Sequence, residues 1–179
     1  MSIERRFSAV TIAAAAILLI GGCSAPSAFT PGGAQPQTPV AAEPITPTGP
    51  QLGQPFEVKQ NDGTAKITIV SATYGDSLGG GAFDSPADNG GYLILDVLWE
   101  TSEGVSSSNF FYFSVKDAEG REGDLSIFVN DPLGAGDVPA GDKSRGNVAF
   151  DIGAGPYTVI VTNQMLQEDK RLTIEATPR

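Results

Sequence analysis

One short segment of the chain has the spacing of a catalytic serine. Gly75-Asp76-Ser77-Leu78-Gly79 fits G-x-S-x-G, a pattern in which a sharp strand-to-helix turn exposes the serine hydroxyl. A serine in that position attacks a carbonyl carbon only when a neighbouring base, almost always histidine, removes its proton. The pattern therefore raises the question of whether the chain is a hydrolase.

The rest of the sequence argues against hydrolysis. The chain has no histidine, and no S-x-x-K spacing supplies a lysine in its place. The glycine-rich text after Ser77 does not favour the helix whose amide groups would stabilise an oxyanion. The same letters spell GDSL, the name-giving block of a lipase and esterase family, but the match arises readily by chance in a chain rich in glycine and serine. We predict no catalytic residues and a protein that is not an enzyme.

Metal and cofactor sites are also poorly supplied. Without histidine and with a single cysteine, the chain lacks the ligands that zinc and copper prefer. Two acidic loops offer oxygen ligands to calcium, but neither follows the D-x-[DN]-x-[DN]-G pattern. No glycine-rich phosphate loop opens a helix. We predict no metal and no cofactor, with calcium on these loops as the open alternative. The loop residues are Asp84 and Asp88 beside Asn89, and Asp117, Glu119, Glu122 and Asp124.

The first 22 residues have the form of an export signal. Arg5 and Arg6 precede an apolar stretch that ends in small residues and is too short for a membrane span. The segment I-G-G-C, which ends at Cys23, resembles the lipobox of bacterial lipoproteins, where a peptidase cuts before the cysteine and the thiol accepts lipid. The resemblance implies a signal peptide over residues 1–22 and a lipid anchor on the extracytoplasmic face of the cell membrane. A free cysteine in a signal-anchored protein is the alternative, and export by the general or the twin-arginine route stays open.

Residues 23–53 have the composition of a linker. Seven of the 13 prolines lie between Ser24 and Pro50, among Gly, Ala, Thr and Gln. Such a segment has nothing to bury, and we predict a disordered, partly polyproline tether. It would span roughly 30 Å as a flexible coil and at most about 80 Å when extended. A single folded domain is expected over residues 54–179.

The charge of the chain limits its partners. The formal net charge is −10, which repels phosphate backbones and anionic lipid headgroups. Nucleic acid is therefore excluded as an expected partner. The acidity either attracts cations or basic partners or, more simply, keeps the domain soluble.

The folded part has the pattern of an all-β protein. Short apolar or alternating runs separated by Gly, Pro and Asp predict about eight strands and no long helix. Trp99 lies on the third of them, where immunoglobulin-like folds often bury a tryptophan. We predict an immunoglobulin-like antiparallel β-sandwich of about seven to nine strands. The expected strands are 54–60, 64–75, 91–101, 110–117, 124–130, 146–152, 156–163 and 171–177.

Turn glycines and alternating apolar residues in the second half carry a family resemblance. The chain is similar to uncharacterised lipoprotein domains of Gram-positive bacteria that resemble the immunoprotective extracellular antigen superfamily. This implies an immunoglobulin-like sandwich over about residues 51–179, and the family has no settled activity to transfer. The matching patterns are Phe113-x-Val115-x-Asp117-x-x-Gly120, Pro139-x-Gly141 and Gly146-x-Val148-x-Phe150.

Four consecutive aromatic residues, Phe110–Phe113, suggest a contact surface. Strand alternation predicts that Phe111, Phe113 and Val115 point into the core and that Phe110 and Tyr112 point away from it. A neighbouring segment could cover the outward rings. Otherwise they form a patch for an envelope protein or a glycan.

These features together predict a membrane-anchored lipoprotein whose domain is a non-catalytic binding or interaction module of the cell envelope. The alternative is a structural or stress-related protein whose partner is the cell wall.

Overall fold

The computed structural model describes residues 49–79 and 85–179, which belong to a compact unit spanning Ile45–Arg179. The predicted signal peptide, Cys23, most of the predicted linker and Asp84 lie outside the described residues. No helix in the described part of the chain is long and apolar enough to cross a membrane.

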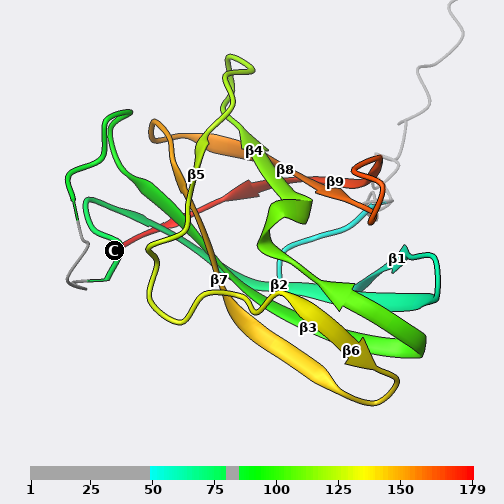
Figure 1. Cartoon of the computed structure of the whole chain (residues 1–179). Helices are drawn as coiled ribbons and strands as arrows, with labels where there is room; N and C mark the ends of the chain where they lie inside the picture. The colour runs from blue at the N-terminus through cyan, green and yellow to red at the C-terminus, as the bar shows by residue number, and fades with distance from the viewer. Residues whose placement is uncertain (1–48, 80–84) are drawn as a thin grey trace, which may run out of the picture. The chain divides into compact units, whose positions relative to one another are not determined.

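The described chain forms two sheets, which Figure 1 shows as two layers with β4, β8 and β9 above β1, β2 and β3. The larger sheet has seven strands in the order β1-β2-β3-β7-β5, with β10 added to β2 and β6 added to β3. The smaller sheet has the order β4-β8-β9. All pairs are antiparallel except β10 with β2. The all-β sandwich prediction is therefore confirmed. The strands are β1 Phe56–Lys59, β2 Gly63–Gly75, β3 Tyr92–Ser108, β4 Phe113–Lys116, β5 Asp124–Ser126, β6 Gly136–Pro139, β7 Lys143–Asp151, β8 Pro156–Thr162, β9 Glu168–Glu175 and β10 Thr177–Pro178.

The core follows from alternation along β3, the longest strand. Its inward residues Leu93, Leu95, Val97 and Trp99 are fully buried, as the sequence predicted. On the opposite face Ile94 is also buried, in a second and smaller apolar cluster. Burial on both faces explains why this strand reads as a nearly continuous apolar run.

Several residues of the family-like patterns have structural roles here. Phe113 and Val115 are buried core residues. Gly120 adopts a φ of 83°, a left-handed conformation that glycine tolerates best, in the turn between β4 and β5. A Cβ at Gly146 would lie 2.5 Å from the backbone of Pro132, so the close approach of that segment to β7 requires a glycine. The patterns therefore encode packing and turns.

Several strands differ in their bounds from the predictions, and the described residues form ten strands where about seven to nine were expected, because β6 and β10 were not predicted as separate strands. The third strand was expected to end at residue 101 but continues to Ser108, because residues 105–108 pair with β6. The strand expected over 124–130 ends at Ser126. Beyond it the chain bulges away from β7 and returns at Asp131, whose carbonyl accepts the backbone N–H of Asn147. The bulge exposes Ile127, whereas Val129 turns inward to fill the smaller cluster.

Candidate functional site

Ser77 lies in a loop that follows β2. Its hydroxyl oxygen accepts the backbone N–H of Gly79 at 3.0 Å, a local turn contact typical of serine. Leu78 between them is buried in the smaller cluster and holds this part of the loop against the sheet. The described residues after Ser77, which are 78–79 and 85–91, contain no helix. The arrangement is that of a turn residue, and the geometry of a nucleophile elbow is missing from the part of the loop that the structure describes.

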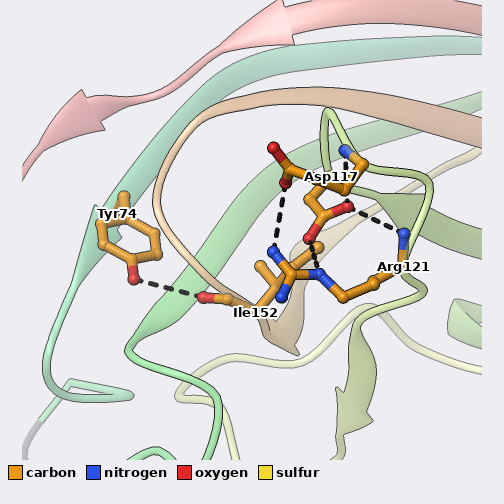
Figure 2. A network of polar contacts seen from close by, with 5 residues as sticks. Tyr74, Asp117, Arg121 and Ile152 are labelled. Atoms are coloured by element: carbon orange, nitrogen blue, oxygen red, sulfur yellow. Dashed lines mark hydrogen bonds and ion pairs between the residues drawn. The ribbon is translucent and has the colours of Figure 1, made fainter.

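Asp117 fastens the turn between β4 and β5, as Figure 2 shows. One carboxylate oxygen accepts the backbone N–H groups of Glu119 at 3.0 Å and Arg121 at 2.8 Å. The other accepts the Arg121 guanidinium Nε–H at 2.7 Å, and a second nitrogen of that guanidinium reaches Glu119 at 3.1 Å. Burial works to raise the pKa of Asp117, but the bonds and the charge of Arg121 outweigh it and hold the pKa below its usual value. The hydrogen bonds of this carboxylate therefore stabilise its own turn.

Asp151 makes a similar clamp at the end of β7. Its two oxygens accept the backbone N–H groups of Asp88 at 2.7 Å and Asn89 at 2.9 Å, which ties the loop before β3 to the sheet. The Asn89 side chain in turn donates to Asp124 at 3.0 Å. Nearby, the Tyr74 hydroxyl donates to the carbonyl of Ile152 at 3.2 Å (Figure 2). We call this region, with its turns 85–91, 117–123 and 151–155, the acidic end.

The two acidic loops do not assemble a metal site in the part of the chain that the structure describes. No group of three or more potential His, Cys, Asp or Glu ligands gathers among residues 49–79 and 85–179. The oxygens of Asp117 and Asp151 already accept N–H groups, so those carboxylates serve as turn fasteners. Asp84, the remaining candidate of the first loop, lies outside the described residues.

The orientation predicted for the aromatic run is wrong. Phe110–Tyr112 form a 3₁₀ turn, η1, instead of the start of a strand. Asn109 causes this, because its side chain accepts the backbone N–H of Phe111 at 2.9 Å and its carbonyl accepts that of Tyr112 at 3.2 Å. The expected alternation therefore fails over these three residues and holds again from Phe113 onward.

The consequence is that three of the four rings are oriented differently from the prediction. Phe110 and Tyr112, predicted to form an exposed patch, are partly buried against the main core, and Tyr112 lies 6.2 Å from Trp99 between ring centroids. Phe111, predicted to be inside, is 61% exposed. Only Phe113 and Val115 occupy the core positions expected of them. Phe111 is therefore the exposed ring of this run.

The turn between β8 and β9 adds two more exposed apolar side chains. Thr162, at the end of β8, donates its hydroxyl to the carbonyl of Tyr112 at 3.3 Å, so this turn lies next to η1. Met165 and Leu166 in the turn are 68% and 66% exposed. Together with Phe111 they are the most exposed large apolar residues among those described. We call Phe111, Met165 and Leu166 the end patch.

Asparagines fasten both turns that carry the end patch. Asn109 holds η1, and Asn163 accepts the backbone N–H groups of Met165 at 2.9 Å and Gln167 at 3.1 Å. Leu166 has a φ of 57°, a left-handed conformation that disfavours leucine and suits Gly or Asn. An apolar residue at an exposed and conformationally costly position is a candidate for a contact role, and sequence reasoning missed it. The only available signal was an apolar pair, Met165 and Leu166, that begins two residues after the turn-forming Asn163.

The fold is shared with solved structures at low sequence identity. MPT63, a secreted protein from Mycobacterium tuberculosis, is 18% identical with a TM-score of 0.55, over 75% of this chain and 100% of that chain. The yjhA protein from Bacillus subtilis is 20% identical with a TM-score of 0.50, over 71% of this chain and 99% of that one.

A third structure, ycdA from Bacillus subtilis, predicted to be a lipoprotein, is 15% identical with a TM-score of 0.51. The match covers 67% of this chain and 38% of that chain. No protein-family model matches the chain, and no curated protein matches it. At these identities the likeness establishes the sandwich fold that the sequence predicted.

Proposed function

We propose that the chain is a lipid-anchored, extracytoplasmic module of the cell envelope that acts by contact and without catalysis. The end patch carries this proposal, because two fastened turns hold Phe111, Met165 and Leu166 in solvent. Of the side chains that could do chemistry, Ser77 and Asp117 accept backbone N–H groups of their own turns. Asp151 accepts those of the loop before β3. The location is supported by the lipobox-like Cys23 and by similarity to the secreted MPT63 and to the predicted lipoprotein ycdA.

The anchor is tested by labelling cells with a fatty-acid analogue. The chain should incorporate the label, and Cys23→Ala should abolish it because Cys23 is the only thiol. The variant should accumulate as an uncleaved precursor or as a released form. Label that persists on Cys23→Ala would overturn the lipid anchor.

The contact function is tested by placing a photo-reactive benzoylphenylalanine at position 111 in the full chain. We expect cross-links from this position and none from the same group at Ile127, an exposed apolar residue outside the end patch. A discrete cross-linked species supports an interaction module, whereas attachment to bulk peptidoglycan favours the wall-associated alternative. Equal cross-linking at both positions would remove the end patch as the contact surface.

The absence of catalysis has its own test at Ser77. A serine-directed fluorophosphonate probe should not label the protein, because the chain has no histidine to activate this hydroxyl. Stoichiometric labelling at Ser77 would contradict the proposal, whatever base proved responsible.

A further inference from the structure

The end patch differs from an ordinary solvated turn in two respects. Turns at the surface favour Gly, Asn, Asp and Ser, yet the turn after β8 presents Met165 and Leu166, with Leu166 at a φ of 57°. The neighbouring turn η1 presents Phe111, whose ring centroid lies 4.5 Å from that of the partly buried Phe110. Phe110 thus supports the exposed ring from below. The patch projects apolar groups from rigid turns.

The charges that directly follow the β8–β9 turn cancel one another. Directly after the turn, Glu168 forms a two-point ion pair with Arg171 at 2.9 and 2.8 Å, and Asp169 pairs with Lys170. Each pair places one positive and one negative charge side by side. The four charges that directly follow the turn therefore sum to zero, although the whole chain has a net charge of −10. Asp62 adds one negative charge nearby, because the N–H of Asn61 beside it donates to the Gln164 side chain at 3.1 Å.

The negative charge lies at the other end of the smaller sheet. Strand β8 begins after the acidic-end turn 151–155 and ends at the turn that carries Met165, so the two regions are separated by the length of the strand. The acidic end holds Asp117, Glu119, Glu122 and Asp124 on one hairpin, beside Asp88 and Asp151. Arg121 offsets only part of this charge. An anionic headgroup layer would repel the acidic end and tolerate the end patch.

The length of chain before the sandwich limits where the domain can be. The described sandwich begins at Gly49, and 25 residues separate it from Cys23. With a predicted span of roughly 30 Å as a coil and at most about 80 Å when extended, such a linker would keep an anchored domain near the membrane surface. The apolar surface that such a domain meets at the highest effective concentration is the bilayer itself.

We propose that the end patch lies on the membrane that anchors the chain, with Phe111, Met165 and Leu166 among the lipid headgroups and the acidic end directed outward. This inference rests on the proposed function and names the partner of the end patch. Phe, Leu and Met are side chains that enter the boundary between headgroups and acyl chains, to a depth of about 5–10 Å for interfacial segments. Weak insertion suffices, because the lipid on Cys23 supplies the anchoring.

The test uses the chain that the predicted cleavage leaves, residues 23–179. Its only thiol, on Cys23, is coupled to a maleimide-headgroup lipid in phosphatidylcholine vesicles, which replaces the natural anchor. Phe111→Trp then reports on insertion, with quenching by brominated phosphatidylcholine as the readout. Trp99 is fully buried and gives a constant background in every variant. Ile127→Trp, at an exposed apolar position outside the patch, is the matched control.

We expect the emission of the tryptophan introduced by Phe111→Trp to shift to the blue and to be quenched, and that of Ile127→Trp to do neither. Adding Leu166→Asn to Phe111→Trp should reduce the quenching while the fold is retained, because Asn accepts a positive φ. Anionic lipid in the vesicles should weaken the contact, and salt should restore it.

Three results would overturn the proposal. One is equal quenching at both positions, and another is none at position 111 despite complete coupling. The third is a blue shift of Phe111→Trp that needs no vesicles and grows with protein concentration, which would assign the patch to a second copy of the chain. Because the coupling is chemical, none of these results depends on natural lipidation. A protein cross-link from position 111 without quenching would keep the interaction module and remove its membrane contact.

Discussion

The two ends of the sandwich use polar and apolar side chains in opposite ways. At the acidic end, carboxylates accept backbone N–H groups: Asp117 fastens its own turn, and Asp151 ties the loop before β3 to the end of β7. At the other end, Asn109 and Asn163 fasten the turns and large apolar residues face the solvent. The end with the more reactive groups is thus the more occupied with its own structure. The end patch has no reactive groups, but its side chains are exposed to solvent and available for contact.

The largest expected effect separates the core below the end patch from the patch itself. Phe113 is 3% exposed and Phe111 is 61% exposed, two residues apart. Phe113→Ala should lower the free energy of unfolding by about 3–5 kcal/mol, because it leaves a large cavity. Phe111→Ala should change it by less than about 0.5 kcal/mol. Urea unfolding of both variants checks this, and similar losses would mean that Phe111 is buried in solution.

A smaller effect is expected from breaking the clamp at the acidic end. Asp151→Ala leaves the N–H groups of Asp88 and Asn89 without their acceptor and should cost about 1–3 kcal/mol. Glu103→Ala removes the same charge from an exposed position on β3 and should cost less than about 0.5 kcal/mol. Hydrogen exchange should rise at Asp88 and Asn89 only in the first variant. Unchanged protection there would show that the carboxylate does not hold the loop.

The acidic end should also respond to alkali. Burial raises the pKa of Tyr157 to about 12, and the nearby backbone N–H of Gly155 lowers it by a smaller amount. The hydroxyl has no hydrogen-bond partner among the described residues. The folded state keeps its proton while the unfolded chain loses it, so the free energy of unfolding should fall as pH rises from 10 to 12, by about 1–2 kcal/mol.

Tyr157→Phe tests this directly by removing the titrating group. The variant should lose most of the alkaline decrease and should be at least as stable at neutral pH, because the hydroxyl it lacks is buried without a partner. A large destabilisation at pH 7 would indicate a hydrogen bond that the structure does not contain. Chemical unfolding across the pH range gives both quantities.

The smallest effect concerns the strained turn of the end patch. Leu166→Asn should raise the free energy of unfolding by about 0.5–1 kcal/mol, because Asn tolerates the φ of 57° that leucine resists. Leu166→Ala keeps the strain and should give no such gain. If both variants gain equally, the leucine side chain and not the backbone is the source of the cost. A stabilised Leu166→Asn with weaker membrane contact would show that the chain sacrifices stability for that contact.

The amino-acid sequence by itself determined the sandwich. The signals for the strands and turns are local: they include the alternation along residues 91–101 and the turn residues Asp117 and Gly120. Such signals predict β-structure wherever a segment fits one periodicity only. The sequence also indicated correctly that Trp99 is buried on the third strand. The residue types needed for acid–base chemistry can be counted without any coordinates, which is why the prediction of a non-enzymatic protein came from the sequence alone.

Only the tertiary structure decided which apolar side chains face the solvent. A run of four aromatic residues fits a strand or a turn. Here Asn109 accepts the backbone N–H groups of Phe111 and Tyr112, which forms the turn and brings Phe111 outward. The turn η1, which carries Phe111, lies beside the turn that carries Met165 and Leu166 because β4 pairs with β8. These two strands are about 50 residues apart in the sequence. Periodicity reports on neighbours along the chain, and the end patch is made by neighbours in space.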